Sequence, residues 1–181
     1  MREITYSYAK NLLNQSQVSE LNEAINKNLI DSKDKYATNA IKSSQVKFVR
    51  LGSVHKYLGK FIDFCFNANN TNYAFDLHHL TSQKILNYNT YSKGEEYSWH
   101  IDASAKSTLS DIKLTCLLNL SEENYDGGEL VLFKGEEVEC KEFNLPGSAV
   151  VFPSFTNHKV NKIKSGSRNT LAIWMNGRKF R

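Results

Sequence analysis

The chain has 181 residues, of which 40% are hydrophobic and 12% aromatic, and its formal net charge is +4 at pH 7. This length and composition are typical of one globular domain, and three widely spaced cysteines argue against a disulfide-rich or cysteine-rich zinc protein. The sequence lacks a signal-peptide pattern and any run of about 18 apolar residues, and its basic residues are scattered. We therefore expect a cytoplasmic protein that binds neither membranes nor nucleic acid.

Two amphipathic helices are predicted in the first part of the chain. Between Ser16 and Leu29, and again between Val54 and Cys65, apolar residues recur at spacings of three and four. Ser16 is available as the cap of the first helix. The asparagines that follow Cys65 favour a turn, so the second helix should end there. We take residues 1–80 as a helical support region.

The hydrophobic period changes to two from about Tyr73 onward, which indicates strands separated by polar turns. The predicted strands are Tyr73–Leu77, Ile85–Tyr91, Tyr97–Asp102, Ile112–Leu120, Leu130–Phe133, Val138–Phe143, Ala149–Phe152, His158–Val160 and Arg168–Met175. Helices followed by strands favour a mainly β, α+β fold, a jelly roll buttressed by helices. We expect a single domain over residues 1–181, with residues 81–181 as its catalytic core.

One carboxylate and two histidines have the pattern of a metal site. His100 and Asp102 are one residue apart, and the period of a strand places both on one face. Trp99 and Ile101 would then face the opposite way, into an apolar layer. His158 follows a later strand and turn. Two histidines and one carboxylate leave three octahedral positions open, the arrangement used by non-haem Fe(II) oxygenases.

A basic residue suited to a carboxylate follows ten residues after His158. Arg168 begins the last predicted strand, and its planar guanidinium can hold the distal carboxylate of 2-oxoglutarate while the other end binds iron. The strand period places Thr170, Ala172 and Trp174 on the same face. Thr170 can serve the cosubstrate, Ala172 leaves room, and Trp174 could form a wall near the metal.

Several short motifs occur in an order and spacing that resemble a known family. They are Tyr91 to Asp102, Tyr125 to Leu130, Pro146-Gly147, Phe152-Pro153-Ser154 with His158, and Gly166-Ser167-Arg168. Over roughly Ile85 to Arg181 the chain resembles the prolyl 4-hydroxylase branch of the Fe(II)- and 2-oxoglutarate-dependent oxygenases, including small bacterial and phage-type hydroxylases. The resemblance implies a distorted double-stranded β-helix, a cupin-like jelly roll. It also implies Fe(2+), with 2-oxoglutarate and O2 as cosubstrates and L-ascorbate as a reductant.

The resemblance also implies an activity and roles for two aromatic residues. The activity is hydroxylation of a C–H bond by a dioxygenase, of the procollagen-proline prolyl 4-hydroxylase type, on a proline-containing peptide or protein. By resemblance, Tyr91 helps to bind the 2-oxoglutarate carboxylate, and Trp174 is the aromatic residue beside the substrate. Each could instead be a packing residue of the sheet. No catalytic side chain is needed beyond the metal site.

The sequence departs from relatives of this type at two positions, and three other functions are alternatives. Lys162 stands where the family often has proline, and Trp174 stands where nucleic-acid demethylases carry a second arginine, which disfavours a nucleic-acid oxygenase. The same chemistry could act on a lysyl, free amino-acid or other small-molecule substrate. A non-catalytic jelly-roll module with a structural metal is the alternative from another class.

The remaining histidines and a central cysteine are given structural roles. His55, His78 and His79 fall in a predicted helix or in loops, where a surface or capping role is expected. Cys116 lies on a predicted central strand without a basic partner nearby in the sequence, so we expect a small buried side chain, not a nucleophile.

Overall fold

Two antiparallel sheets form the body of the protein in a computed structural model that describes residues 5–30, 42–103 and 111–179. The larger sheet has the strand order β1 (Ser7–Ala9), β9 (Ala149–Pro153), β5 (Ile112–Asn119), β12 (Arg168–Asn176), β3 (Ile85–Tyr91) and β2 (Gln45–Arg50). The smaller has the order β4 (Tyr97–His100), β10 (His158–Val160), β7 (Leu130–Phe133) and β8 (Glu137–Glu139). A ribbon of β11 (Ile163–Ser165) and β6 (Asp126–Gly127) lies at one end.

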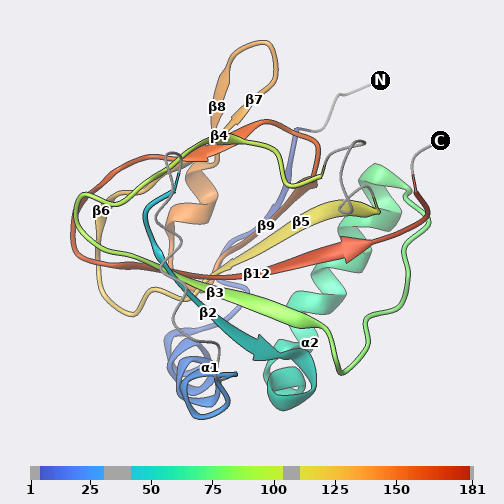
Figure 1. Ribbon diagram of the computed structural model, residues 1–181, viewed down its shortest axis with the longest axis horizontal. Helices are drawn as coiled ribbons and strands as arrows, with labels where there is room; N and C mark the ends of the chain where they lie inside the picture. Colours follow the sequence, from blue (N-terminus) through green and yellow to red (C-terminus); the bar gives the residue numbers. More distant parts are fainter. Residues whose placement is uncertain (1–4, 31–41, 104–110, 180–181) are drawn as a thin grey trace.

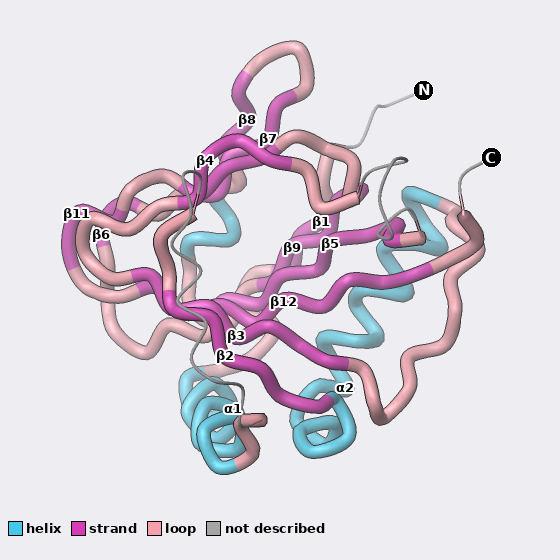
Figure 2. Tube along the Cα trace, in the orientation of Figure 1, coloured by secondary structure: helices cyan, strands magenta, loops and turns pink. Residues whose placement is uncertain are grey.

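Two helices cover the face of the larger sheet that points away from the smaller sheet, as Figures 1 and 2 show. They are α1 (Gln15–Lys27) and α2 (Leu51–Ala68). This arrangement confirms the predicted jelly roll buttressed by N-terminal helices. No helix within the described residues is both long and apolar enough to cross a membrane.

The cap of α1 is Asn14, so the prediction of Ser16 as the cap is wrong. The Asn14 side chain accepts a hydrogen bond from the backbone N–H of Gln17, and the Gln17 side chain accepts one from the backbone N–H of Asn14. This reciprocal capping box satisfies two donors that a helix start leaves without partners. The helix consequently begins before Ser16, whose hydroxyl donates to Glu20 instead.

The two faces of the larger sheet have different environments, because successive side chains of β12 point to opposite faces. Leu171, Ile173 and Met175 are buried in the cluster that includes the apolar faces of α1 and α2. The residues that alternate with them, Thr170, Ala172 and Trp174, point to the opposite face, toward the smaller sheet. The helices therefore stabilise the sheet from behind and leave its other face available for a site.

The predicted strand Tyr73–Leu77 is wrong. Tyr73 ends a π-helical turn, η1 (Asn69–Tyr73), and Ala74 adopts a left-handed conformation with φ 55°. The Asn69 side chain donates to the carbonyl of Phe75 and accepts from its N–H. These side-chain bonds satisfy the backbone locally, which competes with pairing into a sheet.

Other strand boundaries also differ from the prediction. In place of Val138–Phe143, the strand β8 is short and is followed by a 3-10 turn, η2 (Lys141–Asn144). The strand predicted to reach Asp102 ends at His100. The strands β1, β2, β6 and β11 were not predicted.

A pair of glycines makes a tight connection at the end of β6. Gly127 and Gly128 have φ values of 79° and 69°, and a Cβ on Gly127 would lie 2.2 Å from the carbonyl oxygen of Lys162. Replacing Gly127 with alanine should therefore lower the free energy of unfolding by about 3 kcal/mol, measured by urea denaturation.

Gly135 provides the matched control for this substitution. It has a similar φ of 80°, but a Cβ there would meet nothing within 4 Å in the described part of the chain. Gly135→Ala should cost only about 1–2 kcal/mol, the strain of a left-handed alanine. Equal losses in the two variants would show that the contact with Lys162 is unimportant.

Candidate metal centre and cosubstrate cavity

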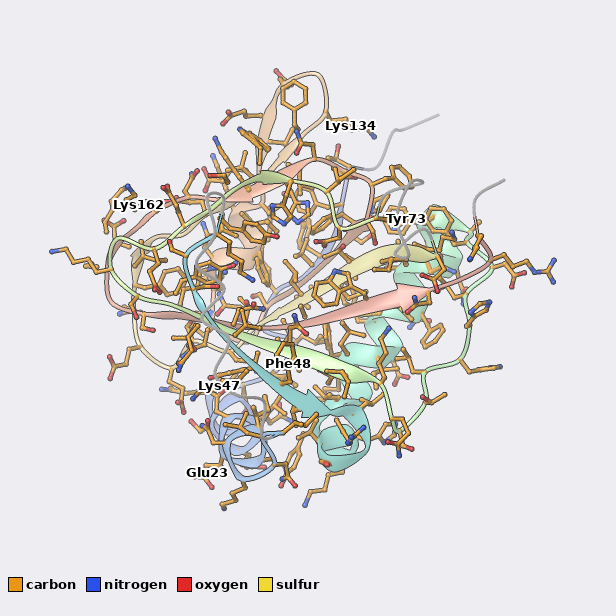
Figure 3. The ribbon with its side chains drawn as sticks, viewed as in Figure 1. Glu23, Lys47, Phe48, Tyr73, Lys134 and Lys162 are labelled. Carbon is orange, nitrogen blue, oxygen red and sulfur yellow. The ribbon has the colours of Figure 1, made fainter. Side chains whose placement is uncertain are left out.

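A cavity of about 340 Å³ lies between the two sheets. Side chains from both sheets line it, and one of them, Phe48 on β2, is labelled in Figure 3. The other lining residues that the argument uses are Lys42, Asn87, Asn89, Tyr91, Tyr97, His100, Asp102, Thr115, His158, Arg168, Thr170, Ala172 and Trp174. All seven residues proposed from the sequence for the metal, the cosubstrate or the substrate lie in this one cavity.

The strand register of the smaller sheet brings the two predicted histidine ligands together. His100 ends β4 and pairs directly with His158, the first residue of β10. Asp102 lies two residues beyond the end of β4, and its backbone N–H donates to the carbonyl of Ser154, in the turn before His158. The turn before β10 thus fixes the carboxylate beside both imidazoles.

The two imidazoles and the carboxylate lie close enough to share one ion. Asp102 Oδ1 is 3.7 Å from His100 Nε2, and Asp102 Oδ2 is 3.7 Å from His158 Nε2. Ligand bonds of about 2.0–2.2 Å allow two donor atoms up to roughly 4 Å apart to bind the same metal. Among the described residues these three are the group of histidine, cysteine and acidic side chains that could hold a metal.

Both imidazoles are held in the tautomer that a metal requires. Nδ1 of His100 lies 2.8 Å from the carbonyl oxygen of Ser98, and Nδ1 of His158 lies 2.9 Å from that of Thr156. A carbonyl oxygen only accepts, so each Nδ1 carries the proton and each Nε2 presents a lone pair. Burial, and then the neighbouring His158, lower the pKa of His100 to about 4, which keeps its ring neutral.

The strand face opposite the ligands differs from the prediction. Trp99 and Ile101 do point away from the cavity, but Ile101 is 47% exposed. The Trp99 ring packs edge-on against Phe133 and lies 4.6 Å below the ammonium of Lys159. The predicted apolar layer is wrong, because this is the outer surface of the smaller sheet.

Arg168 lies at the other end of the cavity and is 1% exposed. Its guanidinium packs between the rings of Tyr91 and Phe143, at 5.7 and 5.2 Å from their centroids. Among the described residues, its Nε and Nη2 atoms have no hydrogen-bond partner. A buried cation with two such donors is costly unless an anion binds it, so the site fits a carboxylate.

The predicted neighbours of Arg168 share this end of the cavity. Tyr91 is the cross-strand partner of Arg168, and Thr170 is the next inward-facing residue of β12. Burial raises the pKa of the Tyr91 hydroxyl, while Arg168 opposes that rise. The hydroxyl is therefore protonated at neutral pH and can donate a hydrogen bond. Binding of a cosubstrate by Tyr91 and Thr170 stays a prediction.

Comparison with known proteins identifies the family. A family model described as the 2OG-Fe(II) oxygenase superfamily matches residues 86–176, about half of the chain. The chain belongs to this superfamily. The superfamily implies Fe(2+), 2-oxoglutarate and dioxygen, which agrees with the donor set of two histidines and one aspartate.

The superfamily members that resemble this chain include bacterial proteins named PKHD-type hydroxylases. The protein from Janthinobacterium sp. (strain Marseille) is 33% identical over 175 residues, which cover 91% of this chain and 75% of that protein. The one from Synechococcus sp. (strain CC9605) is 40% identical over 86 residues, 46% of this chain and 38% of that protein. In the matches to several relatives, the aligned segment covers only 38–41% of the relative's own length.

The fold of this superfamily member is that of the prolyl 4-hydroxylase branch. The viral collagen prolyl hydroxylase of Paramecium Bursaria Chlorella virus-1, in its 2OG complex, superposes with a TM-score of 0.72 at 18% sequence identity. The superposition covers 97% of each chain. The double-stranded β-helix expected from the sequence is confirmed.

The carboxylate ligand of the oxygenase site is fixed by two donors that face it. Asp102 Oδ2 accepts hydrogen bonds from the hydroxyl of Thr115 at 2.6 Å and from the indole N–H of Trp174 at 2.9 Å. Thr115 on β5 and Trp174 on β12 are cross-strand partners. With Oδ2 held in this way, Oδ1 is the oxygen left to bind a metal. Trp174 thus contacts a predicted metal ligand, and its own predicted contact with substrate stays a prediction.

Removing the indole donor should weaken metal binding. Trp174→Phe keeps an aromatic ring but leaves Asp102 Oδ2 with Thr115 alone, so we expect about tenfold lower Mn²⁺ affinity by calorimetric titration. Trp99→Phe, on the outer surface, is the control and should bind as the wild type does. A Trp174→Phe variant with unchanged metal affinity and a raised KM for substrate would instead assign Trp174 to the substrate.

The sequence-based reasoning missed several polar residues of this cavity, including Thr115, which donates to Asp102. Asn87 and Asn89 share the inward face of β3 with Tyr91, a period-two pattern that could have identified them. Lys42 precedes β2 and has no motif around it. As predicted, His55, His78 and His79 are exposed. Cys116 is a buried free thiol on β5, also as predicted.

Proposed function

We propose that this chain is an Fe(II)- and 2-oxoglutarate-dependent hydroxylase that acts on a peptidyl proline. The observation that carries the proposal is one cavity with a metal-ligand triad at one end and the buried Arg168 at the other. A 2-oxo dicarboxylate needs both features, because one end chelates the metal and the other needs a cation. The Nε and Nη2 groups of Arg168, which lack a hydrogen-bond partner in the part of the chain that the structure describes, match the two oxygens of a carboxylate.

Each residue then has a defined task. His100, Asp102 and His158 would hold Fe(II), which supplies the open coordination positions at which a 2-oxo acid and dioxygen meet. Arg168 and Thr170 bind the distal carboxylate of 2-oxoglutarate, and Tyr91 donates its hydroxyl to the same group. Arg168 and Tyr91 are buried, which strengthens the charge-assisted bonds that they would make.

The choice of a prolyl substrate follows from the relatives. The bacterial proteins are named hydroxylases, and the viral structure is named a collagen prolyl hydroxylase. A proline-containing peptide or protein is therefore the proposed substrate, ascorbate the proposed reductant, and the cytoplasm the proposed location. Lysyl and small-molecule substrates would use the same metal and cosubstrate residues.

A cosubstrate assay tests this function. The purified protein is incubated with Fe(II), ascorbate and 2-oxoglutarate, with a proline-rich peptide, the same peptide with lysine for proline, or free amino acids. We expect succinate formation that requires iron and is stimulated by the proline peptide, which gains one oxygen atom by mass spectrometry. Stimulation only by another substrate would refute the prolyl assignment. An absence of succinate under every condition would favour the non-catalytic module.

A further inference from the structure

A lysine enters the cavity from the segment that joins the two sheets. Lys42 forms an isolated bridge with Tyr97 of β4, and the backbone N–H of Ser43 donates to the carbonyl of Glu96 at 3.0 Å. Three residues after Lys42, at Gln45, the chain enters the larger sheet as β2. Figure 1 shows β2 leading from the level of β4 down along the larger sheet. The main chain at Lys42 is thus fixed against the smaller sheet.

The ammonium of Lys42 lies between the polar row of β3 and the metal ligands. Its Nζ donates to Asn89 Oδ1 at 3.1 Å and lies 4.8 Å from the centroid of the Tyr97 ring. That ring stacks on the His100 imidazole at 3.5 Å. Asn89 in turn is the cross-strand partner of Thr170, one inward-facing row from Arg168. Lys42 therefore flanks the space between Arg168 and the triad.

The described residues that line the cavity include more cationic side chains than carboxylates. Of the described lining residues, Lys42 and Arg168 are cationic, and Asp102 is the carboxylate. Burial lowers the pKa of Lys42 to about 8, and the attraction of Asp102 opposes that change. A partly buried ammonium that lines the same cavity as Arg168 can donate a charge-assisted hydrogen bond to an anion that binds there. A bound metal ion would add positive charge and strengthen the demand for anions.

We propose that Lys42 is a second carboxylate-binding residue of this cavity, separate from Arg168. The inference rests on the proposed function, because it assumes that acids occupy this space. Two carboxylates have the required chemistry: the one at the metal-binding end of 2-oxoglutarate, and an acidic group on the primary substrate. Either would accept a charge-assisted hydrogen bond from Nζ, with Asn89 holding the ammonium in place.

Three variants isolate the charge of Lys42. Lys42→Met keeps the aliphatic stem and removes the cation, and Lys42→Arg restores a cation. Lys47→Met is the matched control, since Lys47 lies on β2 next to Phe48 and outside the cavity lining, as Figure 3 illustrates. Thermal unfolding of each variant first establishes that the fold is retained.

Two binding measurements distinguish the sources of the carboxylate. The first titrates 2-oxoglutarate into Mn²⁺-loaded protein without oxygen. The second compares N-acetyl-L-proline with its uncharged amide on protein saturated with 2-oxoglutarate. If Lys42 binds the cosubstrate, Lys42→Met weakens the first interaction about tenfold and Lys42→Arg recovers part of it. If it binds the substrate, the wild type prefers the acid, and Lys42→Met loses that preference.

Two results together would overturn the proposal. In the first, Lys42→Met binds 2-oxoglutarate as tightly as the wild type and Lys47→Met do. In the second, the wild type does not prefer the acid over the amide, or Lys42→Met shows the same preference. Because both readouts are binding, they are separate from the succinate assay. A protein that makes succinate normally but fails both binding tests retains the proposed function and loses the role of Lys42. A protein that makes none loses the function itself.

Discussion

Replacing His100 with alanine should weaken divalent-metal binding by about 100-fold or more and abolish iron-dependent succinate formation. The loss of an outer-shell partner of a metal ligand already costs 10- to 100-fold, so the loss of the ligand itself should cost at least as much. His100 Nε2 is one of three predicted ligand atoms, and its removal leaves only those of Asp102 and His158. Calorimetric titration with Mn²⁺ and the succinate assay measure the two effects.

The fold should survive this substitution. His100 is the last residue of the four-residue strand β4, and it contributes a stacking contact with Tyr97 but little to the main apolar clusters. His55→Ala is the matched control, since His55 is exposed on α2 and does not line the cavity. It should bind metal as the wild type does. Full iron-dependent turnover in His100→Ala would contradict the triad.

Periodicity predicted the longer elements and failed for strands without local boundaries. The strands β3, β5 and β12 and the helices α1 and α2 have clear periods over many residues. In contrast, β2 runs directly into α2, which starts at Leu51 without a side-chain cap, so no capping residue marks the change. The three-residue strand β1 exists because it pairs with β9, about 140 residues later in the chain.

The residues of the candidate site likewise fall into those that local spacing predicts and those that it does not. The pair His100 and Asp102, and the row that begins at Arg168, follow from spacing within single segments. Thr115 and Lys42 contact Asp102 and Asn89, which are 13 and 47 residues away, through the register of strands that no local pattern encodes. The reasoning that placed Asp102 on the strand was wrong in detail. The carboxylate still reaches the site because the carbonyl of Ser154 accepts a hydrogen bond from the backbone N–H of Asp102, which fixes the main chain there.

Replacing Arg168 with methionine should lower the affinity for 2-oxoglutarate about 100-fold while leaving metal binding unchanged. Removing one partner of a buried, hydrogen-bonded charge pair costs about 2–5 kcal/mol, and about 3 kcal/mol corresponds to this change in affinity. Among the described residues, the Arg168 guanidinium packs against Tyr91 and Phe143 and not against the predicted metal ligands. Anaerobic titration of Mn²⁺-loaded protein with 2-oxoglutarate measures the effect.

The stability of the ligand-free protein separates a binding role of Arg168 from a structural one. Without an anion, its buried Nε and Nη2 lack partners among the described residues, so an apolar chain of similar volume should leave the free energy of unfolding unchanged or raise it by about 1 kcal/mol. Arg168→Lys, which keeps the charge but loses the two-pronged geometry, should bind 2-oxoglutarate with intermediate affinity. A methionine variant that unfolds far more easily yet binds 2-oxoglutarate normally would make Arg168 a structural residue. We expect the opposite result: weaker binding of 2-oxoglutarate, with a free energy of unfolding that is equal or higher. That result would show that the buried cation serves to bind the ligand.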